Sequence, residues 1–127
     1  MGRINLPIFL IVGFAGISSA AFAAEGEPAN DGQIAFNNNC RTCHSTNAGD
    51  NRLGPNLNSI IGRKVGGAEG YVYSSAMGSS SFEWTAETLD QFIADPNSVV
   101  PGNNMKPYAG IGEKAVRGAI ISHLKNQ

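Results

Sequence analysis

The chain has 127 residues and a formal net charge of −1, and 15% of its residues are charged. The charged residues are spread singly, with no basic run and no patch of interleaved aromatic and Arg side chains. This pattern argues against a nucleic-acid-binding protein. The length is sufficient for one small domain.

The N-terminal segment, residues 1–23, has the pattern of a secretory signal peptide. Arg3 gives a short positive region, a mostly apolar run follows over 6–17, and small residues end in Ala-Phe-Ala at 21–23. This A-x-A site predicts cleavage directly after it. The apolar run is shorter than the roughly 20 residues of a bilayer span, which makes an uncleaved anchor the less favoured alternative. We expect residues 24–127 to form one domain in the periplasm, an oxidising compartment.

A helix is predicted from Asn30 to residue 39. Asn30 is a suitable N-cap, and Gln33 stands in the capping-box position. Gly32 lowers the stability of a helix, so its presence indicates a close approach by another element. The main apolar residues expected on this helix are Ile34 and Phe36.

This helix leads into Cys40-Arg41-Thr42-Cys43-His44, a C-x-x-C-H pattern typical of covalent attachment of haem c. Two thiols at this spacing lie on one helical turn, and each can add to a vinyl group of the same porphyrin. His44 then lies under the iron and offers an imidazole nitrogen as the proximal ligand.

Two other interpretations use the same cysteines. A disulfide or thioredoxin-like redox pair is the first, although the sequence after Cys43 is loop-like and not a strand–helix–strand pattern. Zinc is the weaker alternative, because two Cys and two His, His44 and His123, supply neither four thiolates nor a paired-His spacing.

A haem would also add a rigid apolar body to the modest core of a small domain. We therefore predict that the haem-free chain is largely unfolded.

Residues 45–70 are predicted to form loops and short turns, in which Gly54-Pro55-Asn56-Leu57 stands out. Pro has no N–H, and its carbonyl is free to accept a hydrogen bond. A haem-ligating His needs such an acceptor for its other ring nitrogen, because that bond fixes the tautomer. We assign this role to Pro55. The expected walls of the site are Leu57, Ile60 and Ile61.

Three regular segments are predicted in the second half of the chain. Tyr71 and Tyr73 face the same side of an extended segment. A helix is predicted over 85–94, with Thr85 as N-cap and a proline stopping it. Its apolar face consists of Leu89, Phe92 and Ile93. A last helix is predicted over about 113–125. Its apolar stripe consists of Val116, Ile120, Ile121 and Leu124.

Met105 lies in a Pro- and Gly-rich loop, 99–110, between these two helices. A loop Met is usually a gap-filler, but a thioether held by a stiff loop also suits a soft ligand on the far side of the iron. Met1 is expected to be removed with the signal peptide, and Met77 does not lie in a comparable Pro- and Gly-rich loop. We therefore predict that His44 and Met105 are the axial ligands.

The whole set of motifs resembles that of the class I cytochromes c of the mitochondrial-like bacterial type. The shared motifs are Gly32 and Phe36 before C-x-x-C-H, Gly-Pro-Asn-Leu at 54–57, Gly-Arg-Lys at 62–64, Tyr73, Trp84, Pro101-Gly-x-x-Met105, and Arg117 through Leu124-Lys125. The resemblance implies an all-α fold in which the first and last helices cross near Gly32 and Ile120/Ile121, and loops wrap one haem. It also implies that Arg63, Tyr73 and Trp84 donate to the haem propionates. Asn103 stands at a cofactor-binding position usually held by Thr and can still donate.

The chain departs from the family pattern at two groups of positions. The first is expected to affect the midpoint potential of the haem, and the second the docking of redox partners. Phe92 stands where Tyr is common and Met77 where Asn is common, so we expect a drier pocket around Met105 and a higher potential. Family lysines around the haem edge are replaced here by Asn39, Asn97, Ser98 and Asn104. The basic contacts that remain are Arg41, Arg52 and Lys106. We therefore expect weak electrostatic steering and more apolar docking.

Two axial side-chain ligands leave no coordination position for a substrate, which predicts a one-electron carrier and not an enzyme. The monomer would shuttle electrons from a quinol–cytochrome c reductase or periplasmic dehydrogenase to an oxidase or reductase, without stable membrane insertion after signal cleavage. A gas-binding or peroxidase-like haem protein is the rival, and it requires Met105 to be absent from the iron. A binding module without haem is the third alternative.

Overall fold

The computed structural model describes Gly2 and residues 28–127, so the predicted signal peptide and its cleavage site lie outside the described residues apart from Gly2. The helices of the described part are α1 (Pro28–Asn39), α2 (Ser75–Gly78), α3 (Ala86–Ala94), α4 (Pro96–Val99) and α5 (Lys114–Leu124). Within 28–127 the only β pairing is an isolated bridge between Lys64 and Glu83. The expected all-α fold is confirmed. No helix among the described residues is long and apolar enough to cross a membrane.

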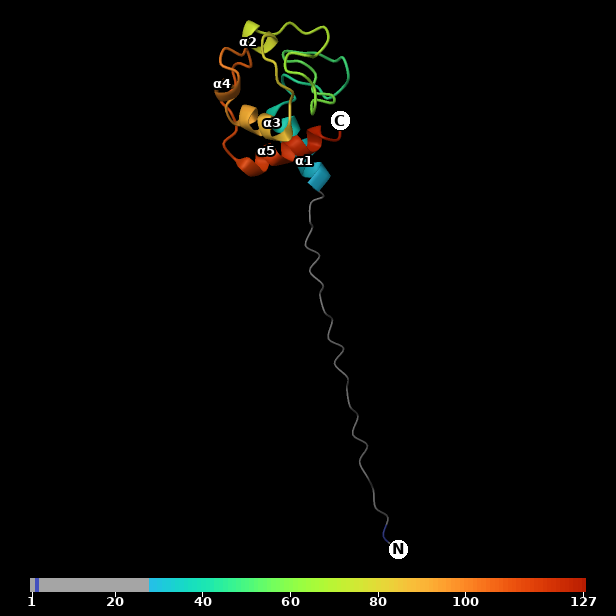
Figure 1. Ribbon diagram of the computed structural model, residues 1–127. Coiled ribbons are helices and arrows are strands. Elements are labelled where there is room, and N and C mark those ends of the chain that lie inside the picture. Colours follow the sequence, from blue (N-terminus) through green and yellow to red (C-terminus); the bar gives the residue numbers. More distant parts are fainter. Residues whose placement is uncertain (1, 3–27) are drawn as a thin grey trace.

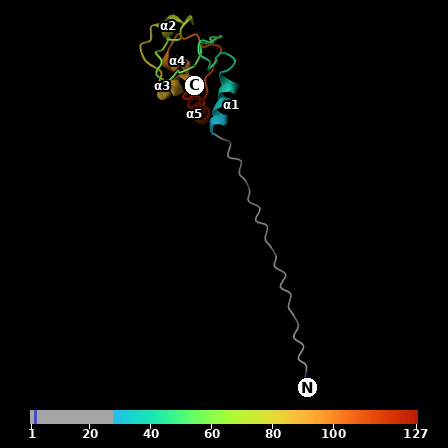
Figure 2. The ribbon, with the colours of Figure 1, turned by 90° about the vertical axis from the view of Figure 1, so that its right-hand side faces the viewer.

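Helices α1 and α5 pack across each other at one end of the molecule, while the loops around α2 form the other end (Figures 1 and 2). At the crossing, a Cβ atom on Gly32 would lie 2.8 Å from the carbonyl oxygen of Ala119 and 3.0 Å from the Cβ of His123. The close approach predicted at Gly32 is therefore confirmed. It brings the ring of Phe36 within 5.4 Å of the His123 ring, measured between centroids.

One prediction for α1 is wrong. The helix begins at Pro28, so Asn30 lies inside it and is not its N-cap. Ile34 is 48% exposed, whereas Phe36 is 4% exposed. Two residues along a helix are separated by roughly 200° of rotation, so these side chains lie on nearly opposite faces, and only Phe36 can face α5.

Helix α3 follows its prediction closely. The Thr85 side chain accepts from the backbone N–H of Thr88, and the Thr88 side chain accepts from the backbone N–H of Thr85. This reciprocal cap uses Thr88 in the place where the motif usually has Glu or Gln. The predicted apolar face, formed by Leu89, Phe92 and Ile93, is buried.

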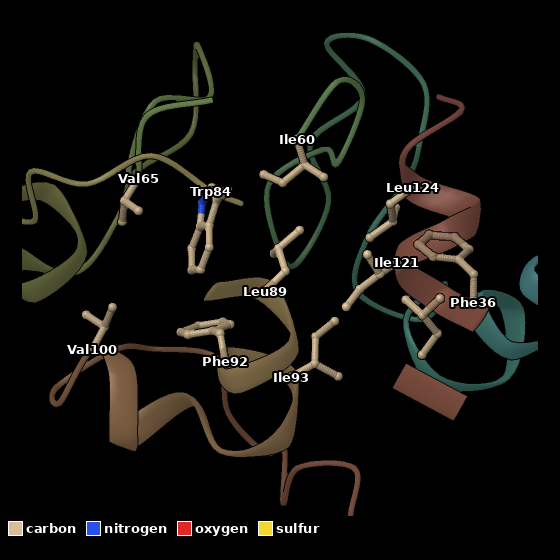
Figure 3. Packing of buried hydrophobic residues seen from close by; sticks show 11 residues of the cluster. Phe36, Ile60, Val65, Trp84, Leu89, Phe92, Ile93, Val100, Ile121 and Leu124 are labelled. Carbon is tan, nitrogen blue, oxygen red and sulfur yellow. The ribbon is translucent and has the colours of Figure 1, made fainter. Parts of the chain in front are cut away.

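The buried hydrophobic core joins α1, α3 and α5 to the loops (Figure 3). The Trp84 indole lies against the Phe92 ring, with 5.0 Å between ring centroids and 64° between planes. Of the expected wall residues, Ile60 is buried and Leu57 is half-buried against the core, but Ile61 is exposed. Ile61 precedes Gly62, which has a φ of 84°, and its role as a wall of the site stays a prediction.

Helix α5 carries a buried charge, Arg117, whose partners were not predicted from the sequence. The Arg117 guanidinium donates from Nε to Asp90 Oδ1 at 2.8 Å, and from one terminal nitrogen to the carbonyl oxygens of Ile111 and Gly112. The hydrogen bond from Arg117 holds the pKa of the Asp90 carboxyl below its usual value. One side chain thereby ties α5 to α3 and to the end of the Met105 loop.

Candidate functional site

The cysteine segment continues the helical path of α1. The backbone N–H of Cys40 donates to the Phe36 carbonyl at 2.8 Å, and the N–H groups of Cys43 and His44 donate to the Cys40 carbonyl at 3.1 and 2.9 Å. Both thiols are unpaired, and burial raises the pKa of Cys40 from 9.0 to about 11, with the nearby Cys43 adding to the shift. A redox-active pair needs a lowered thiol pKa, so the redox interpretation loses support here.

His44 lies next in this turn, and its imidazole is held by the following loop. The residue is 8% exposed, and its Nδ1 atom lies 2.8 Å from the carbonyl oxygen of Pro55. Nδ1 must carry the hydrogen in this contact because a carbonyl can only accept. The lone pair of Nε2 is then left for a metal. Burial lowers the pKa of His44, which favours the neutral ring that a metal requires.

Gly54 supports the His44 ring by having no side chain, a role that the sequence analysis did not identify. A Cβ atom on Gly54 would lie 2.7 Å from Nδ1 and 2.9 Å from Nε2 of the imidazole. The backbone N–H of Gly54 donates to the Cys43 carbonyl at 2.8 Å. The loop therefore lies directly against the ring and holds it from two sides, as the attachment of a haem with a proximal His requires.

Met105 lies in the loop between α4 and α5, as predicted. It is half-buried and packs against the hydrophobic core, as do Cys40 and Leu57. The end of α3 holds the far side of this loop, because the Ile93 carbonyl accepts from the Tyr108 hydroxyl and from the Ile111 N–H. The fold thus brings the cysteine segment and the Met105 loop to one apolar core.

Asn103 has a different setting from the one expected. It is 2% exposed, and its Nδ2 atom donates to Asn97 Oδ1 at 3.1 Å and to the Val100 carbonyl at 2.9 Å. Its Oδ1 atom accepts from the backbone N–H of Met105 at 3.0 Å. Both amide hydrogens are used within the loop, which leaves none for a cofactor in this arrangement. Nothing in the sequence pattern had indicated Asn97 as a partner.

The three side chains expected to donate to propionates are placed as follows. Arg63 donates to the carbonyl oxygens of Asn56, at 2.7 Å, and Asn58. The Tyr73 hydroxyl accepts from the Ala68 N–H at 3.0 Å, so its own hydrogen is free to donate. The Trp84 indole nitrogen has no hydrogen-bond partner among residues 28–127.

The prediction that Tyr71 and Tyr73 face the same side is confirmed. The rings of Tyr71 and Tyr73 meet edge to face, with 4.8 Å between their centroids. The Tyr71 hydroxyl donates to the Leu53 carbonyl at 2.9 Å, which fixes the segment on the loop that follows the cysteines.

The polar residues at the expected docking surface are exposed, as predicted from the sequence. These residues are Asn39, Asn97, Ser98 and Asn104. Of the three basic residues, Arg52 forms an ion pair with Asp50 at 2.8 Å. Arg41 and Lys106 are exposed and form no ion pair within the described chain.

Comparisons with known proteins agree with this site. Residues 29–126 match the family model described as cytochrome c. Cytochrome c2 iso-2 of Magnetospirillum fulvum is 40% identical over 87 residues, which cover 68% of this chain and 90% of that protein. Cytochrome c2 of Blastochloris viridis is 32% identical over 117 residues, 91% of each chain. The structure of cytochrome cH from Methylobacterium extorquens matches with a TM-score of 0.70 and 38% identity, over 78% of this chain and 98% of that chain. The chain therefore belongs to the cytochrome c family, as a class I cytochrome c, whose members are haem c electron carriers and not enzymes.

Proposed function

We propose that this cytochrome c is a periplasmic one-electron carrier with one haem c, attached through Cys40 and Cys43 and ligated by His44 and Met105. The contact between His44 Nδ1 and the Pro55 carbonyl, 2.8 Å, carries the proposal. It fixes the tautomer in which Nε2 can bind iron, and it makes that nitrogen a stronger donor. Met105 completes the set because its loop packs against the same core as Cys40.

The bound haem supplies a couple between Fe(II) and Fe(III), and the protein's own residues set its surroundings. His44 and Met105 would hold the iron in both oxidation states, which would exclude substrate and keep the reorganisation small. The apolar core against which Met105 packs would limit the access of water. Tyr73 and Trp84, with the remaining N–H groups of Arg63, are the donors for the propionates, because each retains a hydrogen that the fold does not use.

Replacing Met105 by alanine tests the carrier against a ligand-binding haem protein. The ferric wild type should show the near-red charge-transfer band of a Met-ligated haem, and Met105→Ala should lose it and bind exogenous ligands. The spectrum of Met77→Ala should retain the band, because Met77 lies on α2 and is the matched methionine. A five-coordinate high-spin spectrum in the wild type would favour the gas-binding or peroxidase-like alternative, and a negative pyridine haemochrome assay would rule out haem altogether.

The periplasmic location rests on the signal-peptide pattern of residues 1–23. The proposed donor is a quinol–cytochrome c reductase or a dehydrogenase, and the acceptor is an oxidase or reductase. With Arg52 paired to Asp50, only Arg41 and Lys106 among the three predicted basic contacts remain to steer an acidic partner. Weak steering and apolar docking by a monomer are therefore proposed.

Phe92 offers a test of the drier pocket. Phe92 is buried in the apolar cluster against which Met105 packs. A hydroxyl at this position adds a polar group that favours ferric iron, so Phe92→Tyr should lower the midpoint potential. A hydrogen bond of about 0.5–1.5 kcal/mol corresponds to about 20–60 mV for one electron. Potentiometric titration measures the shift, with Phe92→Leu as the control without a hydroxyl. An unchanged or raised potential in Phe92→Tyr would contradict the account.

A further inference from the structure

Two asparagine side chains form a brace beneath the loop that carries Met105. Asn97 lies on the short helix α4, and Asn103 lies two residues before Met105. The Asn103 amide donates to Asn97 Oδ1 at 3.1 Å, and its oxygen accepts from the Met105 N–H at 3.0 Å. We call these two side chains the amide brace. It links α4 to the backbone of the proposed ligand.

Backbone groups fix the direction of every hydrogen bond in the brace. The Met105 N–H can only donate, so it must face the oxygen of Asn103, and the Val100 carbonyl can only accept, so it must face the nitrogen. The second hydrogen of that nitrogen therefore requires an acceptor from Asn97. Asn97 is itself fixed at the start of α4, where its backbone N–H donates to Asp95 Oδ1 at 3.1 Å.

Burial makes the two ends of the brace unequal. Asn103 is 2% exposed, so an unpaired N–H there loses its hydrogen bond without gaining one to water. Asn97 is exposed, so truncating its side chain removes the acceptor and little packing. A change at the Asn97 side chain is therefore transmitted to Met105 through Asn103.

We propose that Asn97 is a positioning residue that keeps Met105 on the iron by acting through Asn103. The inference rests on the proposed ligation by His44 and Met105. Without the Asn97 acceptor, Asn103 is held by fewer bonds, and the loop opens more often. The fraction of molecules with Met105 away from the iron rises accordingly.

Imidazole binding to the ferric holoprotein measures this fraction. Imidazole takes the position of Met105 only in opened molecules, so its apparent Kd falls in proportion as the opened fraction rises. Asn97→Ala should lower the apparent Kd about fivefold to tenfold, the effect of one lost hydrogen bond to a buried group. Asn97→Lys, which has no acceptor, should behave like Asn97→Ala. Asn97→Asp keeps the acceptor oxygen and should stay within about twofold of the wild type.

Two controls separate the brace from general effects. Asn104→Ala changes an exposed asparagine of the same loop for which the described chain shows no side-chain hydrogen bond, and it should leave the Kd unchanged. Ile120→Val destabilises the α1–α5 core and should also leave it unchanged. Equal imidazole affinity in Asn97→Ala and Asn104→Ala, with the near-red band present in the wild type, would overturn the brace alone, as would an equal effect of Ile120→Val. A wild type without the near-red band would overturn the ligation itself, and the brace with it.

Discussion

Gly54→Ala is expected to prevent normal placement of His44, the proposed proximal ligand. The added methyl group would lie 2.7 Å from Nδ1 of His44, closer than non-bonded atoms approach, and a rigid imidazole can only move away. Such overpacking costs about 1–3 kcal/mol. Displacing the ring also breaks its bond to Pro55, and losing such a supporting contact typically lowers metal affinity about 10–100-fold. The yield of haem-loaded protein and the midpoint potential measure the effect.

Gly112→Ala is the matched control for this experiment. A Cβ atom on Gly112 meets no atom within 4 Å, and no positive φ strains a side chain there. The control should load haem like the wild type. A Gly54→Ala protein with wild-type haem content, near-red band and potential would show that the loop does not hold the His44 ring as the structure indicates.

The haem-free double variant Cys40→Ala/Cys43→Ala is expected to be largely unfolded. Helices α1, α3 and α5 have 12, 9 and 11 residues, and isolated helices shorter than about 12–15 residues are marginal in water. They depend on the core that they form together with the loops, against which Leu57 and Met105 also pack. A total stability of about 5–15 kcal/mol cannot absorb the loss of the largest apolar body in such a core.

Far-ultraviolet circular dichroism and thermal melting test this expectation. The double variant should show low helix content and no cooperative transition. Thr42→Ala, which changes one of the two exposed residues between the cysteines, should keep haem, helix content and a sharp melt. Native-like helix content with cooperative melting in the haem-free variant would contradict the dependence of the fold on its cofactor.

Features that depend on nearby residues could be predicted from the sequence. The cap at Thr85 and the apolar face of α3 follow from residues within one or two turns of each other. The carbonyl of Pro55 could be assigned to His44 because few groups close to a haem His are obliged to accept. Gly32 could be predicted to lie at a contact, because glycine destabilises a helix and a close approach by another element explains its presence there.

Features set by the direction of a side chain in three dimensions could not be predicted. Ile34 is apolar but 48% exposed, because the rotation of α1 places it on the face nearly opposite Phe36. The contact of Gly54 with the His44 ring and the bond from Asn103 to Asn97 join segments whose approach no periodicity encodes. The pairing of Arg117 could have been predicted in part, because a charged side chain beside the apolar stripe of α5 needs an ion-pair or hydrogen-bond partner when it is buried.

The crossing of α1 and α5 has a consequence for the order of assembly. The two helices that form the centre of the core are separated in sequence by every other described element. The native contacts at Gly32 cannot form until α5 has been synthesised, and closing so large a loop is slow. During that interval the cysteine turn beside α1 is still reachable from outside. The topology therefore gives the proposed attachment of haem a period of access to Cys40 and Cys43 before α5 packs against α1.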